Sequence, residues 1–499
     1  MALLIEPGEI VDSAAYKNAV NRLREAKVLL PTFTELAEAP THLAGMLSVL
    51  DDVDPDEARA ENLYRVHWYN QHSRHEFTDV PGHIVLTEEL TGVATPIVVV
   101  LGGRFPMIGA HKVLPAYGCL VTKLVSGQFD PVENRAIWPS TGNYCRGGVA
   151  ISRILGCRGV AVLPEGMSKE RFSWLEDWVS EKKDIIRTPG SESNVKEIYD
   201  KCAELSSDPA NVILNQFSEF ANYLVHFQCT GRAIEKVIKF LRPDSDRQNL
   251  AAFVAGTGSG GTLAAGDYLQ DVFGARIAAV EPLECPTMLY NGYGAHNIQG
   301  IGDKHIPLIQ NVMNTDMVVG VSDAACDQLN VLFNTEAGRR YLAGRREIDT
   351  NTVDALASLG LSGIANVLAS IKLAKSLDLT GDDIVATVAT DSSLLYQSER
   401  EQTEAGFFAG GFDDVSAGET YARHILGQSA DHTVELNHRD RRRVFNLGYY
   451  TWVEQQGVPL DDFDVRAEPE FWKGLQATIP KWDHMIENFN VETGVNRPG

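Results

Sequence analysis

The sequence has few basic residues for its acidic content. Its 499 residues include 44 Lys and Arg against 67 Asp and Glu, so the formal net charge at pH 7 is −23. This balance argues against nucleic acid or an anionic membrane surface as the main partner. An anionic small molecule is still compatible with it, because backbone N–H groups at a helix N-terminus can hold phosphate inside an acidic protein.

Long apolar runs, paired cysteines and a metal-ligand cluster are also lacking. The longest apolar runs, such as PIVVVLGG at 96–103, are too short to cross a bilayer. Seven cysteines include no C-x-x-C pair, and the first residues carry acids without a basic region. We therefore expect reduced thiols, no signal peptide and a cytoplasmic location. His72 and His75 have no companion ligands, so no metal site is expected.

Short apolar runs rich in Val, Ile and Ala alternate with helical patterns through the middle of the chain. This alternation predicts an α/β fold with buried, mostly parallel strands. The first 80 residues predict a largely helical segment, with a strand at NLYRVHWYN, 62–70. The expected strands of the core are GHIVL at 82–86, PIVVVLGG at 96–103, GVAVLPEG at 159–166, NLAAFVAGTG at 249–258, IAAVEP at 277–282 and DIVATVATDS at 383–392.

A glycine-rich stretch at 249–269 predicts a strand, a tight turn and a helix. Its backbone N–H groups and hydroxyls are suited to bind phosphate, and they belong to Gly258, Ser259, Gly260, Gly261 and Thr262. No Lys follows the glycines, which excludes a Walker A loop. Gly256, Gly258 and Gly261 also fit the dinucleotide pattern G-x-G-x-x-G, with Glu281 ending the next strand. On this stretch alone, a Rossmann-type oxidoreductase and a plain strand-to-helix turn both stay open.

Lys112 follows the expected strand at 96–103 and stands among small and apolar residues, in FPMIGAHKVLPAYGCLV. Most lysines are solvated surface cations. A lysine that is removed from water has a lowered pKa and can form a Schiff base with a carbonyl. Lys112 is therefore a candidate for covalent catalysis.

Six stretches taken together resemble the fold type II family of pyridoxal-phosphate (PLP) enzymes, which includes cysteine synthase, cystathionine β-synthase and the tryptophan synthase β subunit. They occur in the family's order between about residues 85 and 400. The six stretches are GAHK at 109–112, STGN at 140–143, ILNQFSEFANYLVHFQCTG at 213–231, GTGSGGT at 256–262, IQGIGDKHIP at 298–307 and GLSGIAN at 360–366.

The resemblance implies a role for each motif. Lys112 would carry the cofactor and act as the catalytic base, while Asn143 would bond the phenolic oxygen of the cofactor. The glycine-rich loop, 258–262, would hold the phosphate, and Ser362 would face the pyridine nitrogen. The substrate would contact Ser140, Thr141, Gly142, Tyr144 and Gln216. Tyr144 departs from the family, which usually has Thr there, so we expect it to narrow the choice of substrate.

The resemblance also implies an architecture and a reaction. It predicts two open, mostly parallel twisted-sheet domains, with a catalytic core at 85–400, a smaller inserted lobe at about 115–225, and helical extensions at 1–84 and 401–499. The expected enzyme is a homodimeric lyase or synthase. It would catalyse β-elimination or β-replacement on a small amino acid through an aminoacrylate intermediate, in the manner of cysteine synthase. A PLP-dependent threonine or serine dehydratase, or a racemase, is the alternative within the family.

Overall fold

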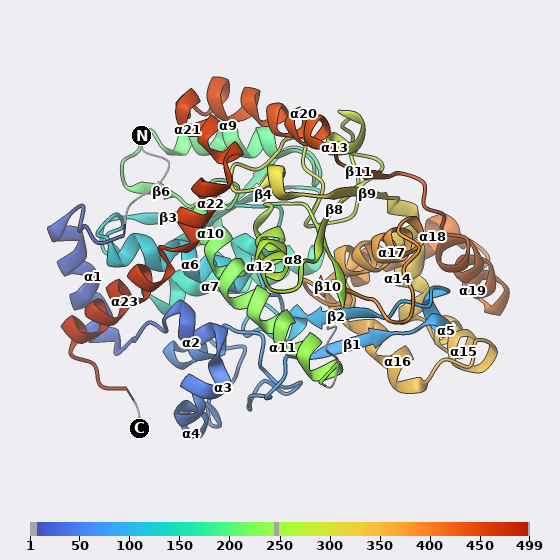
Figure 1. Ribbon diagram of the computed structural model, residues 1–499. Helices are drawn as coiled ribbons and strands as arrows, with labels where there is room; N and C mark the ends of the chain where they lie inside the picture. The colour runs from blue at the N-terminus through green and yellow to red at the C-terminus, as the bar shows by residue number, and fades with distance from the viewer. Residues whose placement is uncertain (1–6, 244–248, 498–499) are drawn as a thin grey trace.

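Two β-sheets form the framework of the protein (Figure 1). The computed structural model describes residues 7–243 and 249–497. The large sheet has seven strands in the order β1-β2-β10-β7-β8-β9-β11, with the first and last strand antiparallel to their neighbours. Its strands are β1 (His83–Leu86), β2 (Ile97–Leu101), β10 (Ile384–Ala389), β7 (Leu250–Gly256), β8 (Arg276–Pro282), β9 (Met317–Val321) and β11 (Thr433–Glu435).

The small sheet has four parallel strands in the order β5-β4-β3-β6. They are β5 (Ile185–Thr188), β4 (Arg158–Pro164), β3 (Arg135–Pro139) and β6 (Asn211–Ile213). Of these, the sequence predicted only β4. The other three have three to five residues, and none has more than two consecutive β-branched residues, which is too short a run for pattern analysis to detect.

Helices connect the strands and cover both sheets. Those between β1 and β10 are α5 (Glu88–Thr91), η3 (Gly102–Arg104), α6 (Val113–Val125), α7 (Asn143–Ile154), α8 (Lys169–Trp178), η4 (Lys182–Asp184), α9 (Val195–Leu205), α10 (Phe220–Val225), η5 (His226–Thr230), α11 (Gly231–Leu241), η6 (Gly261–Leu263), α12 (Ala264–Phe273), α13 (Thr287–Tyr290), η7 (Val312–Asn314), α14 (Asp323–Asn334), α15 (Glu336–Arg345), α16 (Thr350–Ala355), η8 (Leu356–Ser358) and α17 (Leu361–Ser376).

Alternate residues of the central strands enter two separate cores, one on each face of the large sheet. In β2, Ile97 and Val99 pack with Leu368 of α17, whereas Val98 and Val100 belong to the core that contains Leu269 of α12. Both faces are therefore apolar, which explains why β2 and β10 appear in the sequence as continuous apolar runs.

Helices α1 and α23, from opposite ends of the chain, lie side by side (Figure 1). Tyr16 of α1 donates a hydrogen bond to the Glu492 carboxylate of α23 (3.0 Å), and the backbone N–H of Phe33 donates to Asp483 (2.7 Å). The N-terminal helices are α1 (Ser13–Ala26), α2 (Phe33–Ala37), α3 (Ala39–His42), η1 (Ala44–Met46), α4 (Leu47–Leu50) and η2 (Ala60–Arg65). The C-terminal ones are η9 (Ser393–Tyr396), α18 (Gln397–Phe407), α19 (Asp414–Tyr421), η10 (Ala422–Leu426), α20 (His438–Tyr449), η11 (Tyr450–Gln455), α21 (Leu460–Asp464), η12 (Val465–Ala467), α22 (Pro469–Gln476) and α23 (Ile479–Thr493).

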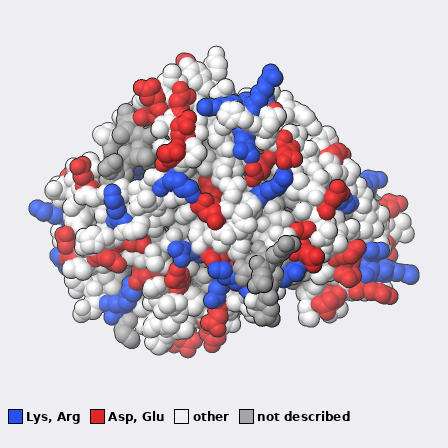
Figure 2. Space-filling model, viewed as in Figure 1, with Lys and Arg blue, Asp and Glu red and all other residues white. Residues whose placement is uncertain are grey.

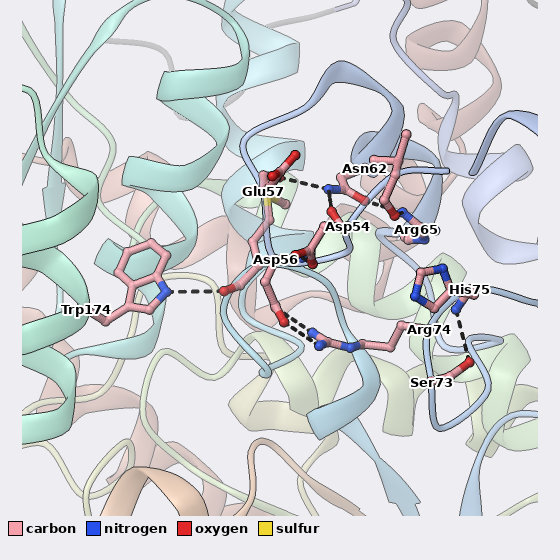
Figure 3. Close-up of polar contacts among 11 residues, drawn as sticks. Asp54, Asp56, Glu57, Asn62, Arg65, Ser73, Arg74, His75 and Trp174 are labelled. Atoms are coloured by element: carbon pink, nitrogen blue, oxygen red, sulfur yellow. Dashed lines mark hydrogen bonds and ion pairs between the residues drawn. The ribbon is translucent and has the colours of Figure 1, made fainter. Parts of the chain in front are cut away.

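The strand expected at 62–70 is wrong, because η2 and irregular backbone occupy this segment. Side chains of this segment, rather than a neighbouring strand, form hydrogen bonds to carbonyl oxygens of residues 50–57. The buried Arg65 donates to the carbonyl oxygens of Val53 (3.0 Å) and Leu50 (2.6 Å), and Asn62 donates to those of Asp54 and Glu57 (both 2.8 Å). Figure 3 shows this polar framework beside Trp174 of α8.

The same framework supports the segment that leads to Lys112. The carbonyl oxygen of Pro55 accepts a hydrogen bond from the Met107 backbone N–H (2.9 Å). Trp174 donates to the Met107 carbonyl oxygen from the other side (3.2 Å). The backbone five residues before Lys112 is therefore held by both the N-terminal segment and α8.

The surface carries both signs of charge. Figure 2 shows acidic and basic side chains interspersed over the viewed face, which disperses the net negative charge. Within residues 7–243 and 249–497, no helix combines the length and the apolar character needed to cross a membrane.

We expect Gly148→Ala to destabilise the protein. A Cβ at this position of α7 would overlap the ring of Trp138 on β3. Overpacking of this kind costs about 1–3 kcal/mol. Gly344→Ala is the matched control, because an added Cβ in α15 meets nothing within 4 Å. Ala there is expected to stabilise the helix by about 0.5–1 kcal/mol. Urea unfolding followed by circular dichroism measures both effects, and equal stability of the two variants would contradict the packing argument.

Candidate active site

The residues predicted to form the site lie beyond the carboxyl ends of parallel strands, where open α/β sheets bind their ligands. Segment 102–112 leads from β2 to Lys112, and the glycine-rich loop, 258–262, follows β7. Ser140 to Asn143 follow β3 of the small sheet, and Ser362 lies in the first turn of α17. The site is thus built from both sheets.

Lys112 lies at the centre of this arrangement. Its side chain is buried, and its Nζ donates to the Ser259 hydroxyl (3.3 Å) and the Gln216 side-chain oxygen (3.5 Å). Burial lowers the pKa of Lys112 to about 8, although the carboxyl groups of Asp303 and Glu192 oppose the shift. The amine is therefore much more readily deprotonated than that of an ordinary lysine.

Two cavities meet at Lys112, and both also contact Gly258, Ser259, Gly300 and Thr390. The first, the phosphate-side cavity, is further lined by Gly256, Gly260, Thr262, Ile301, Ser362, Asn366 and Val388. The second, the loop-side cavity, is further lined by Ser140, Thr141, Asn143, Tyr144, Gln216, Phe217, Gln299 and Asp303. Of the thirteen predicted site residues, all but Gly142 and Gly261 line one of these two cavities.

Gly261 lies behind the wall of the phosphate-side cavity, where a Cβ would overlap the Asn222 amide. Its backbone N–H donates to the Ser259 hydroxyl (3.3 Å), which also accepts from Asn222 Nδ2 (3.1 Å). Gly260 has a φ of +76°, a conformation that favours glycine. The turn thus presents backbone N–H groups and hydroxyls at the start of η6 and α12, a donor set that fits a phosphate.

A chain of buried side chains reaches this cavity from the N-terminal segment. Trp68 Nε1 donates to the Thr230 hydroxyl (3.0 Å), which lies 2.8 Å from His226 Nδ1. The His226 ring packs edge-on against His111, with 5.1 Å between ring centroids, and His111 Nε2 lies 3.5 Å from the Thr262 hydroxyl. Burial lowers the pKa of both histidines well below the usual value, so both are neutral near pH 7.

Gly142 fixes the geometry of the STGN loop. Its φ is +145°, and a Cβ would meet Arg171 Cδ at 2.6 Å, so the position requires glycine. Its backbone N–H donates to the Ser140 hydroxyl (3.0 Å). Asn143 donates to Asp391 (2.6 Å) and accepts from Arg146 (2.9 Å). One N–H of the Asn143 amide stays available for a ligand.

A buried charged network lies behind this loop. Asp391, which follows β10, accepts from the hydroxyl of Tyr396 (2.8 Å) and lies 3.7 Å from Arg171. Arg171 also donates to Tyr396 (2.8 Å) and to Gln299. Together with Arg146 and with Glu192, which also faces Arg171, the network holds two guanidinium groups and two carboxyl groups behind the loop.

Tyr144 lies in the first turn of α7, where its ring packs edge-on against Trp138 with 5.4 Å between centroids. It lines the loop-side cavity, and its contact with a substrate stays a prediction. Glu281, the acid expected to bind ribose in a dinucleotide fold, instead accepts from the backbone N–H groups of Met288 (2.9 Å) and Leu289 (2.8 Å). Its carboxylate therefore caps α13, which disfavours the dinucleotide alternative.

Several polar residues of the site were missed by sequence analysis. Thr390 and Asp391 lie at the end of the strand predicted at 383–392, and Asp303 belongs to the recognised motif at 298–307, so the sequence contained a signal for these three. Arg171, Glu192 and Tyr396 lie far from any motif, and only the folding of the chain brings them to the site.

Comparison with known proteins places the chain among PLP enzymes. A family model described as "Pyridoxal-phosphate dependent enzyme" matches residues 91–338. The chain is 31% identical over 261 residues to cysteine synthase B of Campylobacter jejuni, covering 50% of this chain and 75% of that protein. It is 28% identical over 293 residues to a "Probable cysteine synthase" of Bacillus subtilis, covering 58% and 85%.

Solved structures support the same fold. The O-acetylserine-dependent cystathionine β-synthase of Helicobacter pylori superposes with a TM-score of 0.51 at 23% identity, over 64% of this chain and 94% of that one. The expected architecture of mostly parallel sheets is thereby confirmed, and the dinucleotide-binding alternative is not supported. The chain belongs to the fold type II family of pyridoxal-phosphate-dependent enzymes.

Proposed function

We propose that the protein binds PLP through Lys112 and catalyses β-elimination or β-replacement on a small amino acid. The observation that carries this proposal is a buried amine of lowered pKa between two cavities, one with phosphate-type donors and one beside the STGN loop. The cysteine synthases among the relatives add support, since their names describe a reaction at Cβ of an amino acid.

Residues of the phosphate-side cavity, together with Asn143 of the loop-side cavity, would hold the cofactor. The glycine-rich loop would bind its phosphate, and the second amide N–H of Asn143 would bond its phenolic oxygen. Ser362, buried in the first turn of α17, would face the ring nitrogen. The bound cofactor supplies an electron sink for negative charge at Cα of the substrate. A hydroxyl partner such as Ser362 does not hold the ring nitrogen protonated as a carboxylate would, which suits chemistry at Cβ.

Residues of the loop-side cavity would hold the substrate. Its α-carboxylate would lie on the STGN loop, where backbone N–H groups at the start of α7 would bind it. Ser140, Thr141 and Gly142 would orient this group, with Gln216 on the side of Lys112. Lys112 Nζ would take the proton from Cα, and the substituent on Cβ would then leave.

The pKa of Lys112 predicts how cofactor loading depends on pH. Attack on the carbonyl of PLP requires a neutral amine, and raising the pH removes the proton from Lys112. At pH 8 about half of the Lys112 amines are neutral, against less than about 1% for an ordinary lysine. The loading rate should therefore rise between pH 7 and 9 and level off above that range.

Borohydride reduction followed by peptide mapping measures this loading on the purified protein. We expect a pyridoxyl group on Lys112 and none in Lys112→Arg. A loading rate that keeps rising through pH 10, or a label on another lysine of the chain, would contradict the assignment.

The reaction class is tested with serine, cysteine and O-acetylserine as substrates of the PLP-loaded protein. We expect release of pyruvate and ammonia, or formation of a new amino acid when a nucleophile is added, and no product from Lys112→Arg. Racemisation or transamination of the best substrate without loss of its Cβ substituent would overturn the proposal.

Removal of one charged partner from the buried network should lower the free energy of unfolding. Asp391→Ala leaves Arg171 buried without its carboxylate and should destabilise the protein by about 3–5 kcal/mol. Asp414→Ala is the matched control, because Asp414 pairs with Arg340 on the surface and contributes about 0–1 kcal/mol. Urea unfolding measures the difference, and a similar loss in both variants would argue against a structural role for the network.

A further inference from the structure

Two buried carboxyl groups, those of Glu192 and Asp303, lie close enough to Lys112 to act on the pKa of its amine. Glu192 lies in the loop that follows β5 of the small sheet, and Asp303 lies in the loop between α13 and η7. Asp303 lines the loop-side cavity. Glu192 is only 1% exposed and Asp303 only 6%. Neither Glu192 Oε2 nor Asp303 Oδ2 has a hydrogen-bond partner among the described residues, which is unusual for buried polar atoms.

The charges around this pair do not balance. Lys112 is one cation against two carboxyl groups, and the guanidinium of Arg171, which also faces Glu192, already pairs with Asp391. Burial raises the pKa of Glu192 to about 7 and that of Asp303 well above its usual value. Lys112 opposes both shifts, and the Thr141 hydroxyl and the Gly300 backbone N–H further oppose that of Glu192. A ligand that brings a second positive charge would stabilise both carboxylates.

The position of Glu192 and Asp303 indicates which part of the substrate they would contact. With the α-carboxylate on the STGN loop and Cα beside Lys112, a group on Cβ lies one bond farther on. It therefore stays within reach of carboxyl groups that face Lys112. Neutral leaving groups such as a hydroxyl, a thiol or an acetyl ester bring no positive charge to the pair.

We propose that Glu192 and Asp303 form a cation subsite, and that the substrate is an amino acid with an ammonium group on Cβ. This inference rests on the proposed function and specifies its substrate class. An amine nucleophile fits the subsite less well, because two carboxylates would hold it as an ammonium ion without a free electron pair.

Elimination of ammonia from this substrate needs no reagent other than Lys112. Water is consumed only in the final hydrolysis. Lys112 Nζ accepts the proton from Cα, a double bond forms between Cα and Cβ, and the Cβ–N bond breaks with its electron pair going to nitrogen. Because the leaving nitrogen is an ammonium, it departs as neutral ammonia. Water then releases the α-nitrogen as a second ammonia, so 2,3-diaminopropionate and water give pyruvate and two ammonia molecules.

The first test compares substrates on the wild-type PLP-loaded enzyme. We expect kcat/KM for 2,3-diaminopropionate to exceed that for O-acetylserine and for serine at least tenfold, with two ammonia molecules released per pyruvate. A preference for O-acetylserine or serine would overturn the cation subsite and leave the proposed function intact. Absence of any keto acid or replacement product from all these substrates and from cysteine would instead remove the proposed function.

The second test uses the isosteric variants Asp303→Asn and Glu192→Gln. Each should lower the ratio of kcat/KM for 2,3-diaminopropionate to kcat/KM for O-acetylserine at least tenfold, because one negative charge is lost. Glu88→Gln, an exposed acid in α5, is the control and should leave the ratio within twofold. Circular dichroism and the absorbance of bound PLP identify folded variants. An unchanged ratio in folded Asp303→Asn and Glu192→Gln would overturn the proposal, and the wild-type comparison decides it if neither variant folds.

Discussion

The carboxylate of Asp391 joins the two sheets at the active site. It extends from the end of β10 in the large sheet and accepts a hydrogen bond from Asn143, which begins α7 beside the small sheet. It also holds Tyr396 and pairs with Arg171 of α8, whose side chain packs against Gly142. The position of the STGN loop relative to Lys112 therefore depends on one buried charge and its partners. Such a network is stable only while every member keeps its partner.

The segments outside the matched family region also contribute to the site. Pro55 holds the backbone at Met107, and Trp68 reaches His111 through Thr230 and His226. Both contacts act on the residues immediately before Lys112. The N-terminal segment is in turn packed against α23 at the other end of the chain. The two terminal segments thus support the backbone that leads to Lys112, in addition to extending the core.

Electrostatics within the site differ sharply from those of the whole molecule. The protein carries a formal charge of −23, yet the region behind the STGN loop brings the guanidinium groups of Arg146 and Arg171 together with Asp391 and Glu192. Glu192 and Asp303 also act on Lys112, and burial raises the pKa of both carboxyl groups. The arrangement of these charges can orient a zwitterionic ligand, because burial strengthens each interaction relative to water.

The sequence by itself determined the fold class, the family and most of the residues that line the two cavities. Glycine turns, strand-ending motifs and the lysine among small residues are local features, because each depends on backbone conformation or on a few adjacent residues. The short strands β3, β5 and β6 were missed, since their positions depend on pairing within the small sheet rather than on their own pattern. The strand expected at 62–70 failed because a side chain of the same segment satisfies its backbone: the Asn70 amide donates to the carbonyl oxygens of Arg65 and His67. Only the tertiary structure brought Arg171, Glu192 and Tyr396 to the site. Their contacts join segments far apart in the chain, and no local pattern encodes such distances.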